Sequence, residues 1–187
     1  KKKLPKSVKW KEPKIKKVER VEVTFPGEEY VLLAFRTAAR THKDAEALSV
    51  LDMILDNSTA GLINLNINQQ QLARSAGSYP WKHNDYGAQY LWGIPKQDQD
   101  LAEVEALLLD QIERIKNGQF DESIIPAIVT DFKKSYKQRL EGNGPRVSLM
   151  RDSYLAFEKW EHAVGTLDRM TKLRKKDIVK VAKKYFG

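Results

Sequence analysis

The stretch LARSAGSYPWKHNDYGAQYLWGIP, residues 72–95, decides the fold of this chain. Its two halves, 72–81 and 86–95, are rich in apolar, aromatic and small residues, and the polar residues KHND separate them. Runs of this length and composition, bounded by turn residues, are typical of β-strands. The second half, YGAQYLWGIP, has the composition of a buried strand. The stretch therefore predicts two strands in the middle of the chain.

Two further strands are predicted upstream of this stretch. From Ile15 the pattern is strand-like, and VERVEVTF (18–25) alternates apolar and polar residues, although imperfectly. The segment 28–38, EEYVLLAFRTA, has the composition of a more buried strand. Pro26-Gly27 lies between the two segments and favours a turn, so we expect them to pair in antiparallel fashion.

Helices are predicted wherever apolar residues recur at helical spacing. The first lies between the two strand pairs, at 44–55, and a short helix through Leu65 follows the polar run DNSTAG. Asp98 or Asp100 can cap a long helix at 101–117, and Gly118 suits its C-terminal end. The predicted helices that follow span 122–140, 147–160 and 176–185, and the run EGNGPR (141–146) is expected to connect the first two of these.

This order of elements, with strand runs followed by helix runs, predicts an α+β fold. We expect a two-layer sandwich in which a mainly antiparallel sheet carries its helices on one face. The expected organisation is a basic, Lys/Pro-rich interdomain linker at 1–14 and a single domain at 15–187. Because the sequence stops directly after a predicted helix, we also expect the complete domain to have one further strand.

The net charge of +8 is concentrated at one end of the chain. Residues 1–17 contain nine Lys and one Glu, while the other 170 residues contain 24 basic and 24 acidic groups. A Lys/Pro run of this kind is typical of a solvated linker. The folded part is therefore electrically balanced, which disfavours a nucleic-acid-binding module. No apolar run approaches the ~18 residues that a membrane-spanning helix requires.

Motifs for nucleophilic or phosphate chemistry are absent from the sequence. It has no Cys, no G-x-S-x-G and no G-x-x-x-x-G-K-[ST], and Ser58, Ser75 and Ser78 have no His partner nearby in the sequence. The acidic pair Asp110 and Glu113 is expected on the solvated side of its helix. These residue patterns predict no nucleophilic active site.

Histidine, the commonest zinc ligand besides Cys, is scarce. His42, His83 and His162 lie in three separate predicted elements, and none has another His within helical reach, although His42 and Glu46 stand four residues apart at a predicted helix start. Two ligands do not form a catalytic zinc site, which needs three protein ligands and an open position. We therefore expect His42 at the surface or at a helix N-terminus, His83 in a turn, and His162 near a helix end. The sequence predicts no catalytic, cofactor-binding or metal-binding residue in this chain.

Four segments in this order resemble the insulinase (pitrilysin-like) family of zinc metallopeptidases. They are VLLAFRTAA, LSVLDMILDNSTAGLI, LAEVEALLLDQIERIKNGQFDE and LRKKDIVKVAKKYF, and the resemblance spans about residues 21–186. Members of that family cut peptides with an inverted H-x-x-E-H motif and a further Glu ligand. The corresponding helix here contains HKDAEALSVLDMIL and lacks the motif, so the resemblance is to a non-catalytic domain of the family. It implies that zinc and general base belong to another domain of the same parent protein, which is expected to be periplasmic or secreted.

The resemblance also places two residues of this chain at positions that hold substrate in related domains. Asn66 stands where those relatives have an Arg, and Ala73 stands where they have a Tyr. A guanidinium that could bind a peptide carbonyl is thus replaced by a short amide, and a phenol by a methyl group. Arg74 is adjacent, but in a strand its side chain points to the face opposite Ala73.

The first interpretation is therefore a non-catalytic domain that forms part of a peptidase chamber, with other domains of the same chain and peptide substrates as its partners. Such a domain could offer a strand edge to an extended peptide. The alternative is a scaffold domain whose parent has no peptidase activity, and a basic nucleic-acid-binding module is the disfavoured third interpretation.

Overall fold

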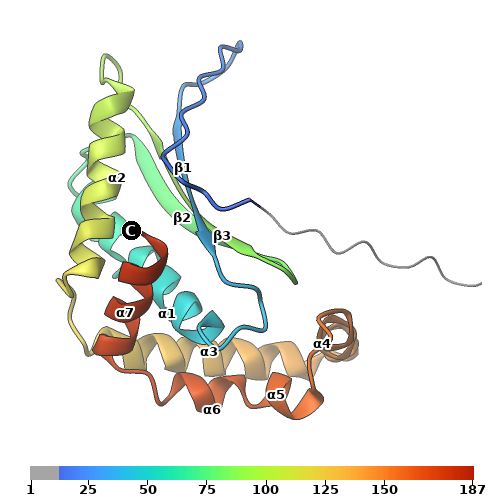
Figure 1. Cartoon of the computed structure of the whole chain (residues 1–187). Coiled ribbons are helices and arrows are strands. Elements are labelled where there is room, and N and C mark those ends of the chain that lie inside the picture. The colour runs from blue at the N-terminus through green and yellow to red at the C-terminus, as the bar shows by residue number, and fades with distance from the viewer. Residues whose placement is uncertain (1–12) are drawn as a thin grey trace, which may run out of the picture.

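The computed structural model describes residues 13–187, so most of the predicted linker at 1–14 lies outside the described residues. The fold has two layers, a three-stranded antiparallel sheet and a set of helices (Figure 1). Helices α1 (Ala45–Leu55), α2 (Leu101–Lys116) and α7 (Lys175–Tyr185) pack on one face of the sheet, and the helices of residues 124–170 lie below it in this view. This arrangement confirms the predicted α+β class, with helices on one face of an antiparallel sheet.

The sheet consists of β1 (Val31–Thr37), β2 (Ser75–Lys82) and β3 (Gly87–Ile94), and β3 occupies the central position. The decisive stretch therefore forms a hairpin, because β2 and β3 pair antiparallel from Ser75↔Ile94 to Lys82↔Gly87. The other edge of β3 pairs with β1, which is also antiparallel to it. Three of the four predicted strands are confirmed, with shifted ends.

The helices that pack on the sheet form where the apolar periodicity predicts them. Asp100 caps the longest of them, because its Oδ1 accepts from the Ala102 N–H at 3.0 Å. Gly118 follows that helix with a φ of +67°, a conformation that suits glycine at a helix C-terminus. These three helices are α1 (Ala45–Leu55), α2 (Leu101–Lys116) and α7 (Lys175–Tyr185).

The core lies between these helices and the sheet. Fully buried residues of α1, α2 and α7 form one core cluster with Leu91 of β3. A Cβ at Gly93 would collide with Val104 of α2, so this glycine allows the helix to approach closely. A residue such as Leu91, with no exposed surface, contributes about 2 kcal/mol by burial. The largest members of this core are Leu51, Ile54, Leu55, Ile63, Ile67, Leu91, Leu108, Ile112, Ile115, Ile128 and Ile178.

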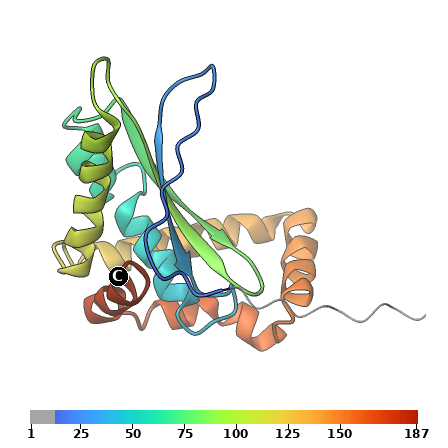
Figure 2. The same ribbon diagram turned by 45° about the horizontal axis from the view of Figure 1, so that its top comes forward.

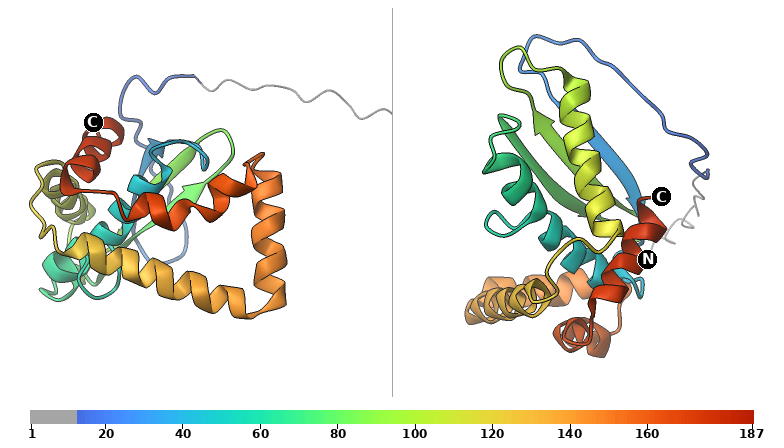
Figure 3. Two further views of the ribbon diagram at one scale, coloured as in Figure 1. Left: turned by 90° about the horizontal axis from the view of Figure 1, so that it is seen from below. Right: turned by 90° about the vertical axis from the view of Figure 1, so that its left-hand side faces the viewer.

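The predicted strand at 18–25 is wrong. This segment has no regular structure, and Val18, Val21 and Val23 are 82%, 85% and 70% exposed. It runs past the sheet as a loop that ends at the top of β1 (Figure 2), and the right-hand view of Figure 3 shows it standing off from the strands. Arg20 holds the loop to α2 by donating to both carboxylate oxygens of Glu105, at 2.7 and 2.8 Å. Alternation of apolar and polar residues is a local pattern, and it does not determine which strand a segment pairs with. The expected pairing of 18–25 with 28–38 does not form, and β1 pairs with β3.

The helical region after α2 differs from the prediction in three places. The helix α3 (Ile124–Glu141) agrees with expectation, but the run EGNGPR is not a connector, because α4 begins inside it and spans Asn143–Leu155. Pro145 is the third residue of α4, where a backbone N–H has no partner within the helix. Two short helices, α5 (Trp160–Val164) and α6 (Thr166–Met170), were not predicted. From below, α3, α4 and the pair α5–α6 form three sides of a frame (Figure 3, left).

The predicted helix at 147–160 ends early because Phe157 adopts a left-handed backbone conformation, with a φ of +54°. This conformation is uncommon for a residue with a side chain, and it stops α4 at Leu155. The Phe157 side chain is 92% exposed, the largest exposure of any bulky apolar residue in the described part of the chain. The short helix expected to end at Leu65 instead includes a π-helical turn, η1 (Asn64–Asn68).

Candidate functional site

The face of the sheet that the helices leave uncovered carries a row of aromatic side chains. Tyr79 stacks on Tyr90 with ring centroids 5.1 Å apart, and Trp81 lies 5.9 Å from the same ring. Register places all three on one face, because Tyr79 pairs with Tyr90 and Trp81 with Ala88. Trp81 is 53% exposed. This aromatic face, defined by Tyr79, Trp81 and Tyr90, is flat, apolar and accessible.

One more residue of this face depends on a glycine. A Cβ on Gly77 would lie 2.9 Å from the indole nitrogen of Trp92, its register partner in β3. The missing side chain lets the Trp92 ring lie across β2 and extends the apolar surface beside Tyr90.

The outer edge of β2 is sealed by side chains rather than by another strand. The carboxamide of Asn68 binds Ala76 twice: its Oδ1 accepts from the Ala76 N–H, and its Nδ2 donates to the Ala76 C=O, both at 2.9 Å. Further along, Asp56 Oδ2 accepts from the Ser78 N–H at 3.0 Å. Pro80 has no N–H to offer. The outward N–H groups of Ala76 and Ser78 therefore already have acceptors and Pro80 has no N–H, which disfavours the addition of an extended peptide at this edge.

The outer edge of β1 is different. In an antiparallel sheet, alternate residues direct both backbone groups to the same side. The backbone groups of Ala76 and Ser78 in β2 point outward, so those of their register partners Gly93 and Leu91 in β3 point toward β1. Gly93 and Leu91 bond to their partners in β1, and the β1 residues between these bonded positions direct their N–H and C=O groups away from the sheet. Leu32 and Ala34 are such residues, and within residues 13–187 no group bonds to their outward N–H or C=O. This edge of the sheet is open.

The Gln-rich stretch that precedes β2 supports the sealed edge. Asn66 donates from Nδ2 to Gln111 Oε1 of α2 at 2.8 Å, so its amide is used inside the domain. Ala73 is buried, and the guanidinium of Arg74 pairs with Glu28 at the surface. Neither Asn66 nor Ala73, nor the adjacent Arg74, is arranged to bind a peptide here.

The histidines and Glu46 do not form a metal site, and the Arg169 guanidinium stands between Glu46 and His162, 3.4 Å from His162 Nδ1. His42 Nδ1 accepts from the Asp44 N–H at 3.1 Å, and Glu46 is buried against Arg169 of α6, whose Nε lies 2.7 Å from Oε1. His83 packs on Trp81 in the turn after β2, and His162 lies 2.6 Å from Glu158. Within residues 13–187 no group of three His, Cys, Asp or Glu side chains could hold a metal ion. The residues present do not fit the zinc ion of a metallopeptidase.

The remaining candidates from the sequence are structural. Ser78 donates from Oγ to Asp52 Oδ1 at 3.0 Å, and Ser58 lies in an exposed turn with a φ of +63°. The pair Asp110 and Glu113 is at the surface, where each carboxylate binds a basic residue of the same helix. Ser75 begins β2 and, like the other two serines, has no His partner among the described residues.

A polar cluster between α1 and the helix-facing side of the hairpin was not predicted. Asp52 accepts from Gln89 Nε2 at 2.6 Å and from the Ser78 hydroxyl, and burial raises the pKa of the Asp52 carboxyl. Lys82 donates from Nζ to Ser49 Oγ at 2.7 Å. The residue as a whole is exposed at the strand end, but its ammonium group turns inward. Burial of this group therefore lowers the pKa of Lys82. The spacing of Ser49 and Asp52 on one helical face was the available signal.

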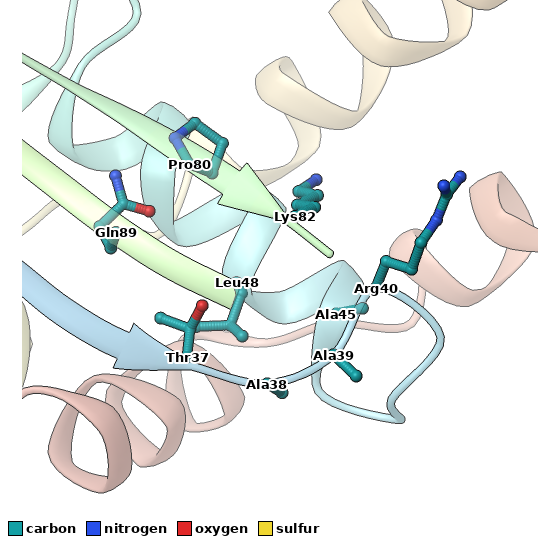
Figure 4. A pocket seen from close by; sticks show the side chains of 9 residues that line it. All are labelled: Thr37, Ala38, Ala39, Arg40, Ala45, Leu48, Pro80, Lys82 and Gln89. Atoms are coloured by element: carbon teal, nitrogen blue, oxygen red, sulfur yellow. The ribbon is translucent and has the colours of Figure 1, made fainter. Parts of the chain in front are cut away.

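The space beside this cluster is too small for a substrate. The cavity in Figure 4 is lined by Thr37, Leu48, Lys82 and Gln89, among others, and its volume of about 10 Å³ is close to that needed for a single water molecule. Lys82 and Ser49 are a pair of groups that could serve nucleophilic chemistry, but the cavity beside them has room for no more than about one water molecule. The cluster joins α1 to the sheet.

Comparison with known proteins agrees with this architecture. The model of the family described as the peptidase M16 inactive domain matches residues 1–131. The chain is an inactive domain of peptidase family M16. This is the family that the sequence resemblance indicates, and an inactive domain accounts for the missing H-x-x-E-H motif. Comparison with curated proteins gives no significant match.

Solved structures share the fold of this M16 domain at low sequence identity. A protease from Helicobacter pylori superposes with a TM-score of 0.78 and 19% identity, over 84% of this chain and 38% of that one. A domain from Bordetella parapertussis, described as the inactive peptidase domain of a zinc protease, gives 0.73 and 14%, over 87% of each chain. Complex III2 from Candida albicans gives 0.68 and 12%, over 83% of this chain and 39% of that one. The M16 domain thus spans a little over a third of the first and third structures.

In the described part of the M16 domain, no helix combines the length and the apolar character that crossing a bilayer requires.

Proposed function

We propose that this M16 domain is a non-catalytic wall of the chamber in a zinc metalloendopeptidase, and that its aromatic face contacts the enclosed peptide. Zinc and the general base then belong to another domain of the same parent protein. The observation that carries the proposal is the sheet face that no helix of residues 13–187 packs against, on which Tyr79 and Trp81 remain exposed. Large exposed apolar patches are uncommon on soluble domains and mark interaction surfaces.

The aromatic face suits peptides that are held by their side chains. Aromatic rings bury about 150–250 Å² each when covered, and they have few rotatable bonds, so they bind apolar side chains at a small entropic cost. A contact between two rings stabilises the complex by a further ~1 kcal/mol beyond the burial itself. Strand addition at β2 is disfavoured by Asn68 and Asp56. Contacts with a peptide on this side of the sheet therefore involve rings rather than backbone.

The open edge of β1 has a different role in this proposal. It supports the expected further strand of the complete domain, because Leu32 and Ala34 present outward backbone groups. The end of α7 is next to this edge: the ring of Phe186 lies 4.9 Å from that of Phe35 in β1. A strand added here would turn the three-stranded sheet into a four-stranded one.

The proposal is tested with the pure chain and an unstructured peptide rich in apolar residues. We expect no hydrolysis with added zinc, and calorimetric titration should show binding that weakens about tenfold in the double variant Tyr79→Ala/Trp81→Ala. Trp160→Ala is the matched control, since Trp160 is a comparably exposed ring on α5, away from the sheet. Equal losses in both variants would remove the aromatic face from the proposal, and chelator-sensitive cleavage by the pure chain would remove the non-catalytic role.

The alternative, a scaffold domain in a parent without peptidase activity, is favoured by a second apolar surface. Seven apolar side chains are exposed along α4, α5 and the turn between them, including Phe157 and Tyr154. Sequencing the rest of the parent protein separates the two functions. An H-x-x-E-H motif in another domain supports the peptidase, and its absence supports the scaffold.

A further inference from the structure

A groove lies between the first turns of α3 and the connection from α6 to α7. Its volume is about 210 Å³, below the 300–1,000 Å³ range of sites for small-molecule ligands. It is suited to one or two side chains of another polypeptide rather than to a cofactor. The apolar lining consists of Ile125, Pro126, Val129, Met170 and Leu173.

The groove offers little to a polar ligand. Two hydroxyl groups line it, and both are used by their own helical turns: Thr130 Oγ1 donates to Pro126 C=O and Thr171 Oγ1 to Asp168 C=O, each at 2.8 Å. Pro126 has no backbone N–H. A buried polar group entering this space would lose its water without finding a ready partner, so the groove selects an apolar side chain.

The rim of the groove carries positive charge only. Lys133 and Arg174 are the two charged residues that line it, and both are exposed. Neither side chain forms an ion pair with a carboxylate in the described residues; the Arg174 guanidinium donates to the neutral C=O groups of Thr171 and Leu173. Lys137, one helical turn after Lys133 and also exposed, continues the basic stripe along α3.

The charge and the lining together specify a partner. We propose that this groove is a docking site for an acidic polypeptide segment with one apolar anchor. The anchor side chain fills the groove, and carboxylates on either side of it meet Lys133 and Arg174. The site is on the helical layer, so it is independent of the aromatic face and of any peptide bound there.

The test uses the complete chain and a fluorescein-labelled nonapeptide with a central Phe between two pairs of Glu. Anisotropy titration at low salt should give saturable binding, and 0.3 M salt should weaken it several-fold, since exposed charges are screened at that ionic strength. Replacing Phe by Ser, or the Glu residues by Lys, should abolish measurable binding.

Variants locate the site. Lys133→Glu together with Arg174→Gln should weaken binding about tenfold, as expected for two exposed charge contacts. Thr130→Trp should block the groove without touching its buried lining, because Thr130 is exposed. Lys159→Glu, outside the groove, is the control for a general charge effect. The proposal is overturned if Thr130→Trp binds like the unchanged chain, if Lys159→Glu matches the double variant, or if the Phe and Ser peptides bind equally.

Discussion

The two edges of the sheet solve the same physical problem in opposite ways. An edge strand exposes a row of N–H and C=O groups that can pair with another chain. On β2, Asn68 supplies a carboxamide that binds Ala76 as a neighbouring peptide group would, Asp56 binds Ser78, and Pro80 removes a donor. On β1, Leu32 and Ala34 have no equivalent partner in residues 13–187. The difference indicates that one edge ends the sheet, whereas the other has backbone groups free to pair with a further strand.

The largest test of this difference is a matched pair of substitutions. Ala76→Pro removes an N–H that Asn68 binds in a buried position, and it should cost about 3 kcal/mol or more in the free energy of unfolding. Ala34→Pro removes an outward N–H at an exposed position, and it should cost about 1 kcal/mol or less. Urea denaturation of the two variants measures both values. Similar losses would mean that the edges are not different.

A smaller effect is expected when the seal itself is removed. Asn68→Ala leaves the N–H and C=O of Ala76 without their partner, which should cost about 2 kcal/mol. It also opens the edge of β2, so the variant should associate at concentrations where the unchanged chain stays monodisperse. Asn64→Ala is a control in the same turn, since Asn64 binds only Thr59 C=O at the surface. Sedimentation velocity together with urea titration checks both expectations.

Asp52 and Asp44, on two sides of α1, should make the stability of the domain depend on pH in opposite ways. Burial raises the pKa of Asp52, beneath β2, so its stabilising contribution is complete below its ordinary value of about 4 and is lost as the pH rises through its folded-state pKa. The pKa of Asp44, beside α7, is lowered: burial opposes this, but hydrogen bonds from Lys184 and Tyr185 outweigh it. Its contribution is present above about pH 4 and is lost only as the pH falls through its folded-state pKa.

Two variants separate these contributions. Between pH 7 and about pH 4, the unchanged chain should gain stability relative to Asp52→Asn as the pH falls, and it should keep a constant difference from Asp44→Asn. Below about pH 4 the difference from Asp44→Asn should shrink. Thermal unfolding at half-unit steps of pH measures these differences. If the stabilities of the unchanged chain and of Asp52→Asn change in parallel with pH, the pKa of Asp52 is not raised by burial.

The smallest effect is expected in the loop before β1. Val21→Ser and Val23→Ser should each change the free energy of unfolding by less than about 0.5 kcal/mol, because both side chains are largely exposed. A loss of about 2 kcal/mol in either variant would show that the segment completes the sheet after all, and it would place a strand on the open edge of β1.

The sequence allowed much of the fold to be predicted where the deciding interactions are local. The helix Leu101–Lys116 has an apolar stripe, a capping Asp100 and a following Gly118, and all three signals lie within its own residues. The run 18–25 has an equally clear alternation, but a strand also needs a neighbour, and that choice depends on residues far along the chain. The run GNGPR appeared to break a helix, yet Pro145 is tolerated in the first turn of α4.

The candidate site was less predictable for the same reason. The absence of a metal-binding motif was evident from the sequence, but the aromatic face requires the register that brings Tyr79 opposite Tyr90. Asn68, the last residue of the π-helical turn, pairs with Ala76 eight residues later, and no sequence pattern predicts a side chain that takes the place of a neighbouring strand. The groove beside α3 combines segments that are about 45 residues apart.

Phe157 has a consequence for measurements on this domain by itself. A left-handed backbone at a non-glycine residue costs of order 1 kcal/mol, and the exposed phenyl ring gains no burial energy that would offset this cost. Any neighbour that covers the ring gains that burial energy by binding the folded state. The melting temperature of the separate domain should therefore be lower than in an assembly in which a neighbour covers Phe157.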